Sequence, residues 1–242
     1  MNEQVRLHER QIAGSLLIAG TLLFFAGLCV LVLGENFIED LSSSLQQHLV
    51  IVSEHAGAWK LGWALLMGGV TSTILGLALL ATLLREAGNR VLSSLGLLLF
   101  LLGAVVWLPN MAFRLSEAIW AGQGVSTRSG STALDFYEVL VDWGSMLLSV
   151  YTVFAFVAMV AFGVAIARTA LLPRWVGWVT VLWSVVLLGM FLLTLEAIPA
   201  LHQFMPLLIG FSLLLARRPV AVSQGDQGRA TANKVLGAVA RD

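Results

Sequence analysis

QIAGSLLIAGTLLFFAGLCVLVLG, residues 11–34, is the stretch of sequence that decides the fold, because it carries no charged residue from end to end. An α-helix rises about 1.5 Å per residue, so about 20 apolar residues cross the roughly 30 Å hydrocarbon core of a bilayer. A cleaved secretory signal has an apolar core of only about 7 to 15 residues. Residues 11–34 are therefore predicted to form an uncleaved membrane span.

The rest of the chain has the same apolar character. Its 242 residues are 58% hydrophobic and 12% charged, with a mean hydropathy of +0.89, whereas about a quarter of the residues in soluble domains are charged. The fold class predicted is all-α, a polytopic membrane protein with a six-transmembrane-helix bundle. Residues 1–216 are expected to form this domain, and residues 217–242 a polar, poorly ordered cytoplasmic tail. The six predicted spans are 11–34, 61–84, 91–108, 144–167, 175–195 and 198–216.

The segment FIEDLSSSLQQHLVIVSEH, residues 37–55, separates the first two spans and shows a helical period. Its apolar residues recur at spacings of three and four, whereas acidic and amide side chains occupy the other side. This pattern predicts an amphipathic outer helix that lies on the membrane interface or caps the bundle. The apolar positions are Ile38, Leu41, Leu45, Leu49 and Val52.

Charged residues divide between the two sides of the predicted membrane. Eleven of the 14 Lys and Arg residues fall on the side that holds both termini, so the positive-inside rule makes those termini cytoplasmic. We therefore expect a multi-pass protein of a bacterial cytoplasmic (inner) membrane. Nine of the 14 acidic residues fall on the other side. They could concentrate cations there, or they could serve only to solvate the loops.

Small residues recur along the first three spans at helical spacings. Lipid gives helices no hydrophobic reason to associate, so tight bundles use small residues that let backbones approach. These positions are therefore predicted to be packing seams. They are Ala13, Gly20, Gly27 and Gly34 in the first span, Ala64, Gly68, Ser72 and Gly76 in the second, and Gly96 and Gly103 in the third.

EAIPALHQFMP, residues 196–206, opens the last predicted span with polar residues and two prolines. Counting back from Arg217 puts Glu196 at the outer boundary and His202 roughly 8 Å deeper in the hydrocarbon. Pro199 suits a first helical turn, whereas Pro206 is expected to free a carbonyl near residue 202 and to kink the helix. The stretch is therefore predicted to be a broken helix end at membrane depth.

An ionisable side chain inside a membrane suggests a functional site. The functional hypothesis is a small outward-opening pocket that holds His202 and Glu196. Its remaining candidate ligand-binding residues are Asn110, Arg114, Asp142 and Tyr151. The alternative is that a neutral His202 only hydrogen-bonds a neighbouring helix, through Tyr151 or through a carbonyl that Pro206 frees. Both interpretations stay open at this stage.

Common catalytic signatures do not occur in the sequence. It contains no H-E-x-x-H, G-x-S-x-G or Walker sequence and only one cysteine, so no catalytic residue and no metal ligand set is predicted. The cofactor is left unknown. A bis-histidine haem would pair His202 with His48 or His55, and only if the first loop folds inward.

The second half of the chain, from about Trp107 to Pro219, resembles a bacterial family of uncharacterised six-span integral membrane proteins, the domain of unknown function four-three-eight-six. This resemblance implies six helices and no particular activity. It rests on FRLSEAIWA at 113–121, LLPRWVGW at 171–178 and HQFMPLLIGFSLLLARR at 202–218.

The function expected from these observations is non-enzymatic: an integral membrane protein that binds or transports a small ligand or ion through an outer-leaflet pocket. Two alternatives remain, an accessory or scaffold subunit of a larger membrane complex and a haem- or quinone-binding redox protein. The expected partners are the lipid bilayer, a small ligand or cation at the outer face, and further copies or subunits in the membrane. Nothing indicates nucleic acid.

Overall fold

The computed structural model describes residues 3–33, 45–124, 131–194 and 199–216. All secondary structure within these ranges is helical, which confirms the all-α prediction. Five of the described helices are long and apolar enough to cross a membrane, and the chain is a multi-pass integral membrane protein. The elements are α1 Glu3–Leu33, α2 Leu45–Glu54, α3 Ala56–Glu86, α4 Arg90–Gly124, α5 Ser131–Arg168, α6 Arg174–Thr194, the 3₁₀ helix η2 Pro199–Gln203 and α7 Phe204–Leu215.

The last predicted span is divided between two short elements. The 12 residues of α7 extend about 18 Å, which is less than the hydrocarbon thickness. Pro206 is the third residue of α7, where its missing N–H is not needed for an intrahelical bond. Pro206 thus lies in the first turn of α7, and the predicted break of the helix is present before it as η2.

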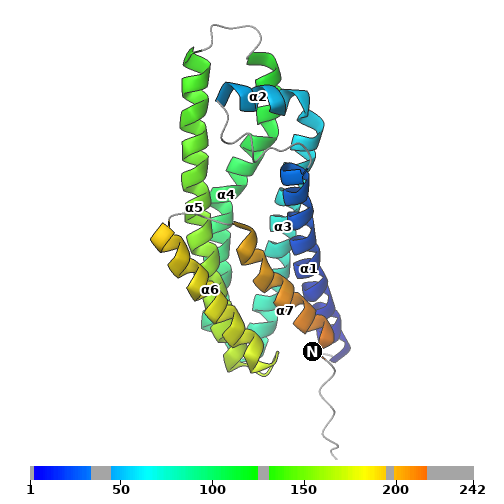
Figure 1. The fold of residues 1–242 in the computed structure, drawn as a ribbon. Coiled ribbons are helices and arrows are strands. Elements are labelled where there is room, and N and C mark those ends of the chain that lie inside the picture. The colour runs from blue at the N-terminus through cyan, green and yellow to red at the C-terminus, as the bar shows by residue number, and fades with distance from the viewer. Residues whose placement is uncertain (1–2, 34–44, 125–130, 195–198, 217–242) are drawn as a thin grey trace, which may run out of the picture.

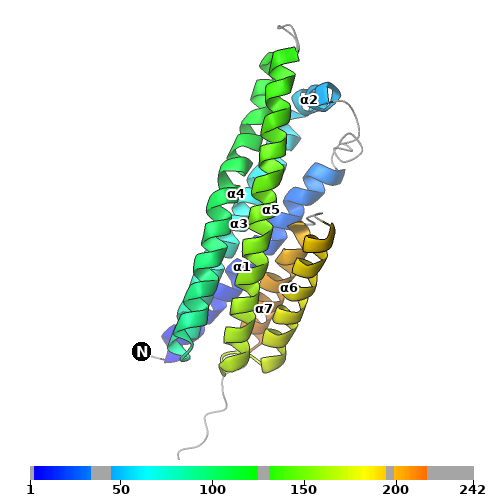
Figure 2. The same ribbon diagram turned by 90° about the vertical axis from the view of Figure 1, so that its left-hand side faces the viewer.

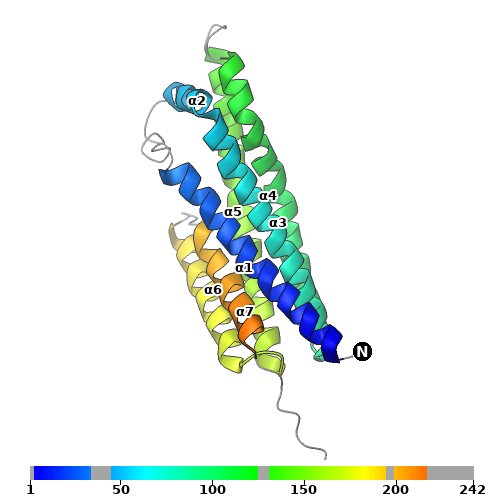
Figure 3. The ribbon, with the colours of Figure 1, turned by 90° about the vertical axis from the view of Figure 1, so that its right-hand side faces the viewer.

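Helices α3, α4 and α5 run side by side along the length of the molecule, and α2 lies across one end of them (Figure 1). Helix α1 crosses α3 obliquely and has α7 on its other flank (Figure 3). The α6–α7 pair covers only the part of the bundle that is remote from α2 (Figure 2). Consequently η2 lies part-way along the bundle and not at its end.

The end remote from α2 gathers arginines and is called the arginine end below. The α3–α4 turn lies there, and Gly88 in this turn has a φ of +98°, a left-handed conformation that glycine adopts without strain. The guanidinium of Arg10 donates to the carbonyl of Leu171 and so ties α1 to the α5–α6 loop. The predicted grouping of basic residues is thus present for those at the described helix ends, whereas the basic residues of the tail lie outside the described residues.

Glycines at seven-residue spacing bring α1 and α3 into backbone contact. A Cβ added to Gly69 would lie 2.8 Å from the carbonyl oxygen of Gly20, and one added to Gly20 would lie 2.9 Å from that of Gly69. Gly27 and Gly62 face each other in the same way, seven residues from Gly20 on α1 and from Gly69 on α3. The predicted seam of α1 is confirmed for the described residues Gly20 and Gly27.

The seam predicted for α3 is wrong in part. Gly76 meets Leu17 and the Ser72 hydroxyl donates to the Leu16 carbonyl at 2.8 Å, but Gly68 has only a methyl of Leu23 at 4.0 Å. The interface follows Gly62, Gly69 and Gly76, a spacing of seven and not of four. Two crossed helices meet along such a stripe because it keeps one face toward the partner.

Other glycines allow close contacts elsewhere in the bundle. Gly96 and Gly103 of α4 face α5, as predicted, and Gly163 of α5 faces Gly177 of α6. Gly14 of α1 and Gly210 of α7 approach each other's carbonyl oxygens, with added Cβ atoms at 2.9 Å in both directions. Thus α7, although short, is held by a backbone contact with the first helix.

Helix α4 is longer than its predicted span 91–108, because it continues through Pro109 to Gly124. Helix α2 occurs where the amphipathic helix is predicted, and its residues Leu49 and Val52 are buried. Residues 34–44 and the tail 217–242 lie outside the described residues.

Candidate functional site

His202 lies in η2 and is buried, with 1% of its surface exposed. Its Nε2 lies 2.8 Å from the hydroxyl of Tyr151 on α5 and 3.2 Å from the amide nitrogen of Gln203. An amide nitrogen can only donate, so with Gln203 oriented as in the structure the Nε2 of His202 accepts. The ring of His202 thus joins η2 to α5.

Gln203 extends this contact to two further helices. Its Oε1 lies 3.4 Å from the Thr73 hydroxyl of α3, and its backbone carbonyl lies 3.3 Å from the Thr21 hydroxyl of α1. All three side chains are fully buried. The indole of Trp183 donates to the Leu201 carbonyl at 3.1 Å and links η2 to α6. A polar layer therefore connects α1, α3, α5 and α6 through η2.

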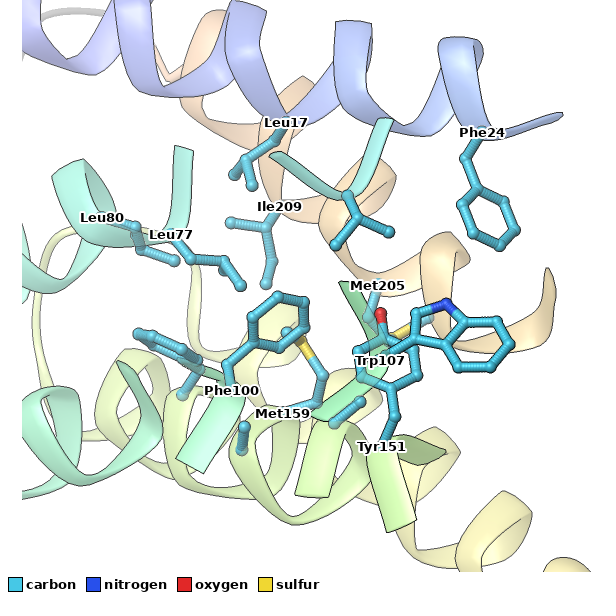
Figure 4. Packing of buried hydrophobic residues seen from close by; sticks show 14 of the residues in the cluster. Leu17, Phe24, Leu77, Leu80, Phe100, Trp107, Tyr151, Met159, Met205 and Ile209 are labelled. Carbon is cyan, nitrogen blue, oxygen red and sulfur yellow. The ribbon is translucent and has the colours of Figure 1, made fainter. Parts of the chain in front are cut away.

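Aromatic rings enclose this polar layer. Trp107 of α4 is stacked on Tyr151, with ring centroids 6.2 Å apart and planes 15° apart, and Figure 4 shows the two rings beside Met205. Phe24 and Phe156 present ring edges to His202 at centroid distances of 5.8 and 6.5 Å. A low-polarity surrounding strengthens the enclosed hydrogen bonds and makes loss of a partner costly.

Of the two interpretations of His202, these contacts agree with a hydrogen bond to a neighbouring helix. The predicted hydrogen bond to Tyr151 is present, and Nε2 already has two protein partners. The same broken helix end that places His202 in the bundle also brings its Nε2 within reach of Tyr151 and Gln203. The residue therefore fixes η2 against α5.

A second buried polar group lies on α4, one turn beyond Trp107. Asn110 is 1% exposed, and neither its Oδ1 nor its Nδ2 has a hydrogen-bond partner among the described residues. It faces Gly144 of α5, where an added Cβ would lie 2.5 Å from Oδ1. The absence of a side chain at residue 144 is what admits the amide between the two helices.

Trp63 of α3 lies at the level of Asn110. The Trp59 indole donates to the Arg114 carbonyl at 2.8 Å, and the Trp63 ring contacts those of Trp59 and Trp107 at 5.9 and 6.4 Å. Residues 107, 110 and 114 follow one face of α4, so the contact of Trp63 with Trp107 and that of Trp59 with Arg114 lie on either side of Asn110 along the helix. The Nε1 of Trp63 is buried and has no partner within the described part of the chain.

The other candidate residues are distributed around these two groups. The Arg114 guanidinium lies 3.4 Å from the Tyr137 hydroxyl of α5, one turn further toward the α2 end. Asp142 is exposed, and Glu196 lies outside the described residues. The structure thus brings Tyr151 to His202 and places Asn110 and Arg114 on one face of α4.

The histidines that a bis-histidine haem would need are at different levels. His48 is on α2, across one end of the bundle, where its ring contacts Trp59 at 5.6 Å, whereas His202 lies part-way along (Figure 1). His55 has its Nδ1 3.2 Å from the carbonyl of Ile51. Within residues 3–33, 45–124, 131–194 and 199–216, no three His, Cys, Asp or Glu side chains form a group that could hold a metal ion.

Three residues at these two sites are not among the sequence-based candidates. Gln203 and Trp63 look like ordinary interior and interfacial residues in the sequence, and Gly144 is one glycine among 23. Only the register between α4 and α5 reveals that Gly144 meets Asn110. Comparisons of the chain with protein-family models, with curated proteins and with solved structures find no match.

Proposed function

We propose that this integral membrane protein binds a small ligand inside its bundle, between α3, α4 and α5, beside Asn110. The observation that carries this proposal is the buried Asn110 amide, which lacks a partner at both polar atoms. A buried unsatisfied amide costs about 1–3 kcal/mol. A ligand that pairs with it recovers this free energy and stabilises the folded protein.

Asn110 suits binding better than His202 does. The Nε2 of His202 already has Tyr151 and Gln203 as partners, so a ligand there would have to displace them. In this proposal Tyr151 supports the wall of the site by stacking on Trp107. Arg114 lies nearer the entrance, and Glu196 and Asp142 are left as residues of the outer rim.

The proposal includes the predicted orientation in the membrane. We take η2 and α7 together as a sixth span, the arginine end as cytoplasmic, and α2 as the outer helix, because basic residues favour the cytoplasmic side. The site then lies in the outer half of the bundle. The resemblance of residues 107–219 to an uncharacterised six-span family agrees with this topology and stays a proposal of the same kind.

Native mass spectrometry of the gently extracted protein tests the proposed function. We expect wild-type protein to carry a non-covalent small molecule that Asn110→Leu loses. Ser184→Ala is the matched control, since the Ser184 hydroxyl is another buried group without a partner among the described residues, on α6. Wild-type protein without any bound mass, or Asn110→Leu with the same bound mass, would refute the proposal.

A further inference from the structure

We infer that the site beside Asn110 recognises a carboxamide or un-ionised carboxylic acid group carried on an apolar molecule. This inference rests on the proposed function, since it names the chemical class of that ligand. It follows from which kinds of hydrogen bond the site can make. Asn110 offers an acceptor, Oδ1, and an amide nitrogen, Nδ2, that carries two N–H donors, and both atoms are buried without a partner among the described residues.

A carboxamide side chain has its acceptor and donor side by side on one edge. A group that presents a donor and an acceptor at the same spacing pairs with both at once, and a carboxylic acid or a second amide does so in a closed ring of two hydrogen bonds. An ester or ketone has no donor and would leave Oδ1 unpaired. An ammonium has no acceptor and would leave Nδ2 unpaired.

Trp63 adds a third interaction at the same level. Its Nε1–H is a donor only, it is buried, and it has no partner in the described part of the chain. A carbonyl oxygen has two lone pairs, so it can accept from Asn110 and from Trp63 together. The site therefore holds three N–H donors and one acceptor. An acid or amide carbonyl can accept from one Asn110 N–H and from Trp63, while its neighbouring O–H or N–H donates to Oδ1.

The surroundings define the rest of the ligand. The rings of Trp59, Trp63 and Trp107 form a continuous series beside α4, and Met111 and Leu66 are buried in the same core. Apolar and aromatic walls with a few placed polar groups are typical of small-molecule sites. An aliphatic or aromatic body attached to the acid or amide group matches these walls.

Photocrosslinking in nanodiscs tests this class of ligand. The probe is a twelve-carbon carboxamide with a diazirine in its chain, and labelled peptides are mapped by mass spectrometry. We expect labelling of the peptides around Trp63 and Asn110. Excess dodecanamide should prevent it, methyl dodecanoate should compete about tenfold more weakly for lack of one hydrogen bond, and dodecylamine should not compete.

Two variants make the test specific. Trp63→Phe keeps an aromatic ring but removes the N–H, and Asn110→Leu removes both amide atoms. Each variant should weaken binding of the probe by about tenfold or more, whereas Ser184→Ala should leave probe binding unchanged. Using both variants keeps the result interpretable if one of them fails to fold.

The outcomes separate the inference from the proposed function. If methyl dodecanoate competes as well as dodecanamide, the site binds apolar molecules without reading the acid or amide edge, and only the inference fails. If the label spreads over the lipid-facing helices, or no probe labels the peptides around Trp63 and Asn110, the inference fails. The proposed function fails with it only when native mass spectrometry also finds no bound mass that Asn110→Leu loses.

Discussion

Substituting two adjacent glycines of α3 tests the α1–α3 contact directly. A Cβ at Gly69 would lie 2.7 Å from the backbone nitrogen of Phe24 and 2.8 Å from the carbonyl of Gly20. Backbone atoms cannot rotate away, and carbon contacts normally lie at about 3.5–4.0 Å. Gly69→Ala therefore forces the helices apart by roughly 1 Å, whereas Gly68→Ala meets only a methyl of Leu23 at 4.0 Å.

The difference between the two variants isolates the contact. Both replace a glycine in the interior of the same helix, so the gain in helix propensity, about 1 kcal/mol, is common to them. Overpacking costs about 1–3 kcal/mol, so Gly69→Ala should be less stable than Gly68→Ala by about that amount. For a chain of this size the melting temperatures should differ by roughly 2–12 °C.

Thermal unfolding in detergent, followed by tryptophan fluorescence, measures this difference. Gly68→Ala is expected to be as stable as the wild type or slightly more stable. A Gly68→Ala variant that melts below Gly69→Ala would show that the four-residue stripe through Gly68 is the real interface, and the seven-residue stripe described above would be wrong.

Three further changes have defined consequences. Tyr151→Phe keeps the ring on Trp107 but removes the bond to His202, so chemical unfolding should show a loss of about 0.6 kcal/mol and at most about 1.7 kcal/mol, the range for interhelical hydrogen bonds in membranes; no loss at all would mean that this bond does not form. Asn110→Leu in ligand-free protein removes two unsatisfied atoms and should stabilise it by up to about 1–3 kcal/mol in the same assay, whereas destabilisation would indicate that the amide has a partner. Gly88→Ala meets no atom within 4 Å but must adopt a φ of +98°, so it should cost about 1–2 kcal/mol; a neutral result would mean that the turn can rearrange.

Much of the fold is predictable from the sequence because lipid imposes a simple rule. Backbone groups must be satisfied within each span, so long apolar runs become helices. Four of the five helices that are long and apolar enough to cross a membrane contain the predicted spans 61–84, 91–108, 144–167 and, except for its last residue, 175–195. The glycine seam of α1 is predictable for the same reason, since small residues are what allow contact. The stripe on α3 is harder, because Gly68 and Gly69 are adjacent and only the crossing geometry selects between them.

The candidate site is predictable only in part. His202 and its partner Tyr151 could be proposed because an ionisable group at membrane depth must be satisfied. Asn110 is a candidate from the sequence, but its position at the α4–α5 interface depends on Gly144 of α5, which leaves room for the amide. A single sequence contains no signal for the register that places Gly144 opposite Asn110. It also contains no signal for the ring contacts of Trp63 with Trp59 and Trp107.

The contact between Gly14 and Gly210 has a consequence for assembly of the protein. The interfaces of α3 with α4, of α4 with α5 and of α5 with α6 join neighbours in the sequence, so each can form as the chain enters the membrane. The α1–α7 contact joins the first and last described helices, and such distant pairings form late. Since η2 precedes α7, the bonds of His202 to Tyr151 and of Gln203 to Thr73 are made at the same final step. Docking of the 17 residues from Pro199 to Leu215 is thus the step that completes the buried polar layer. A chain that stops before Pro199 would lack the hydrogen bond between Tyr151 and His202.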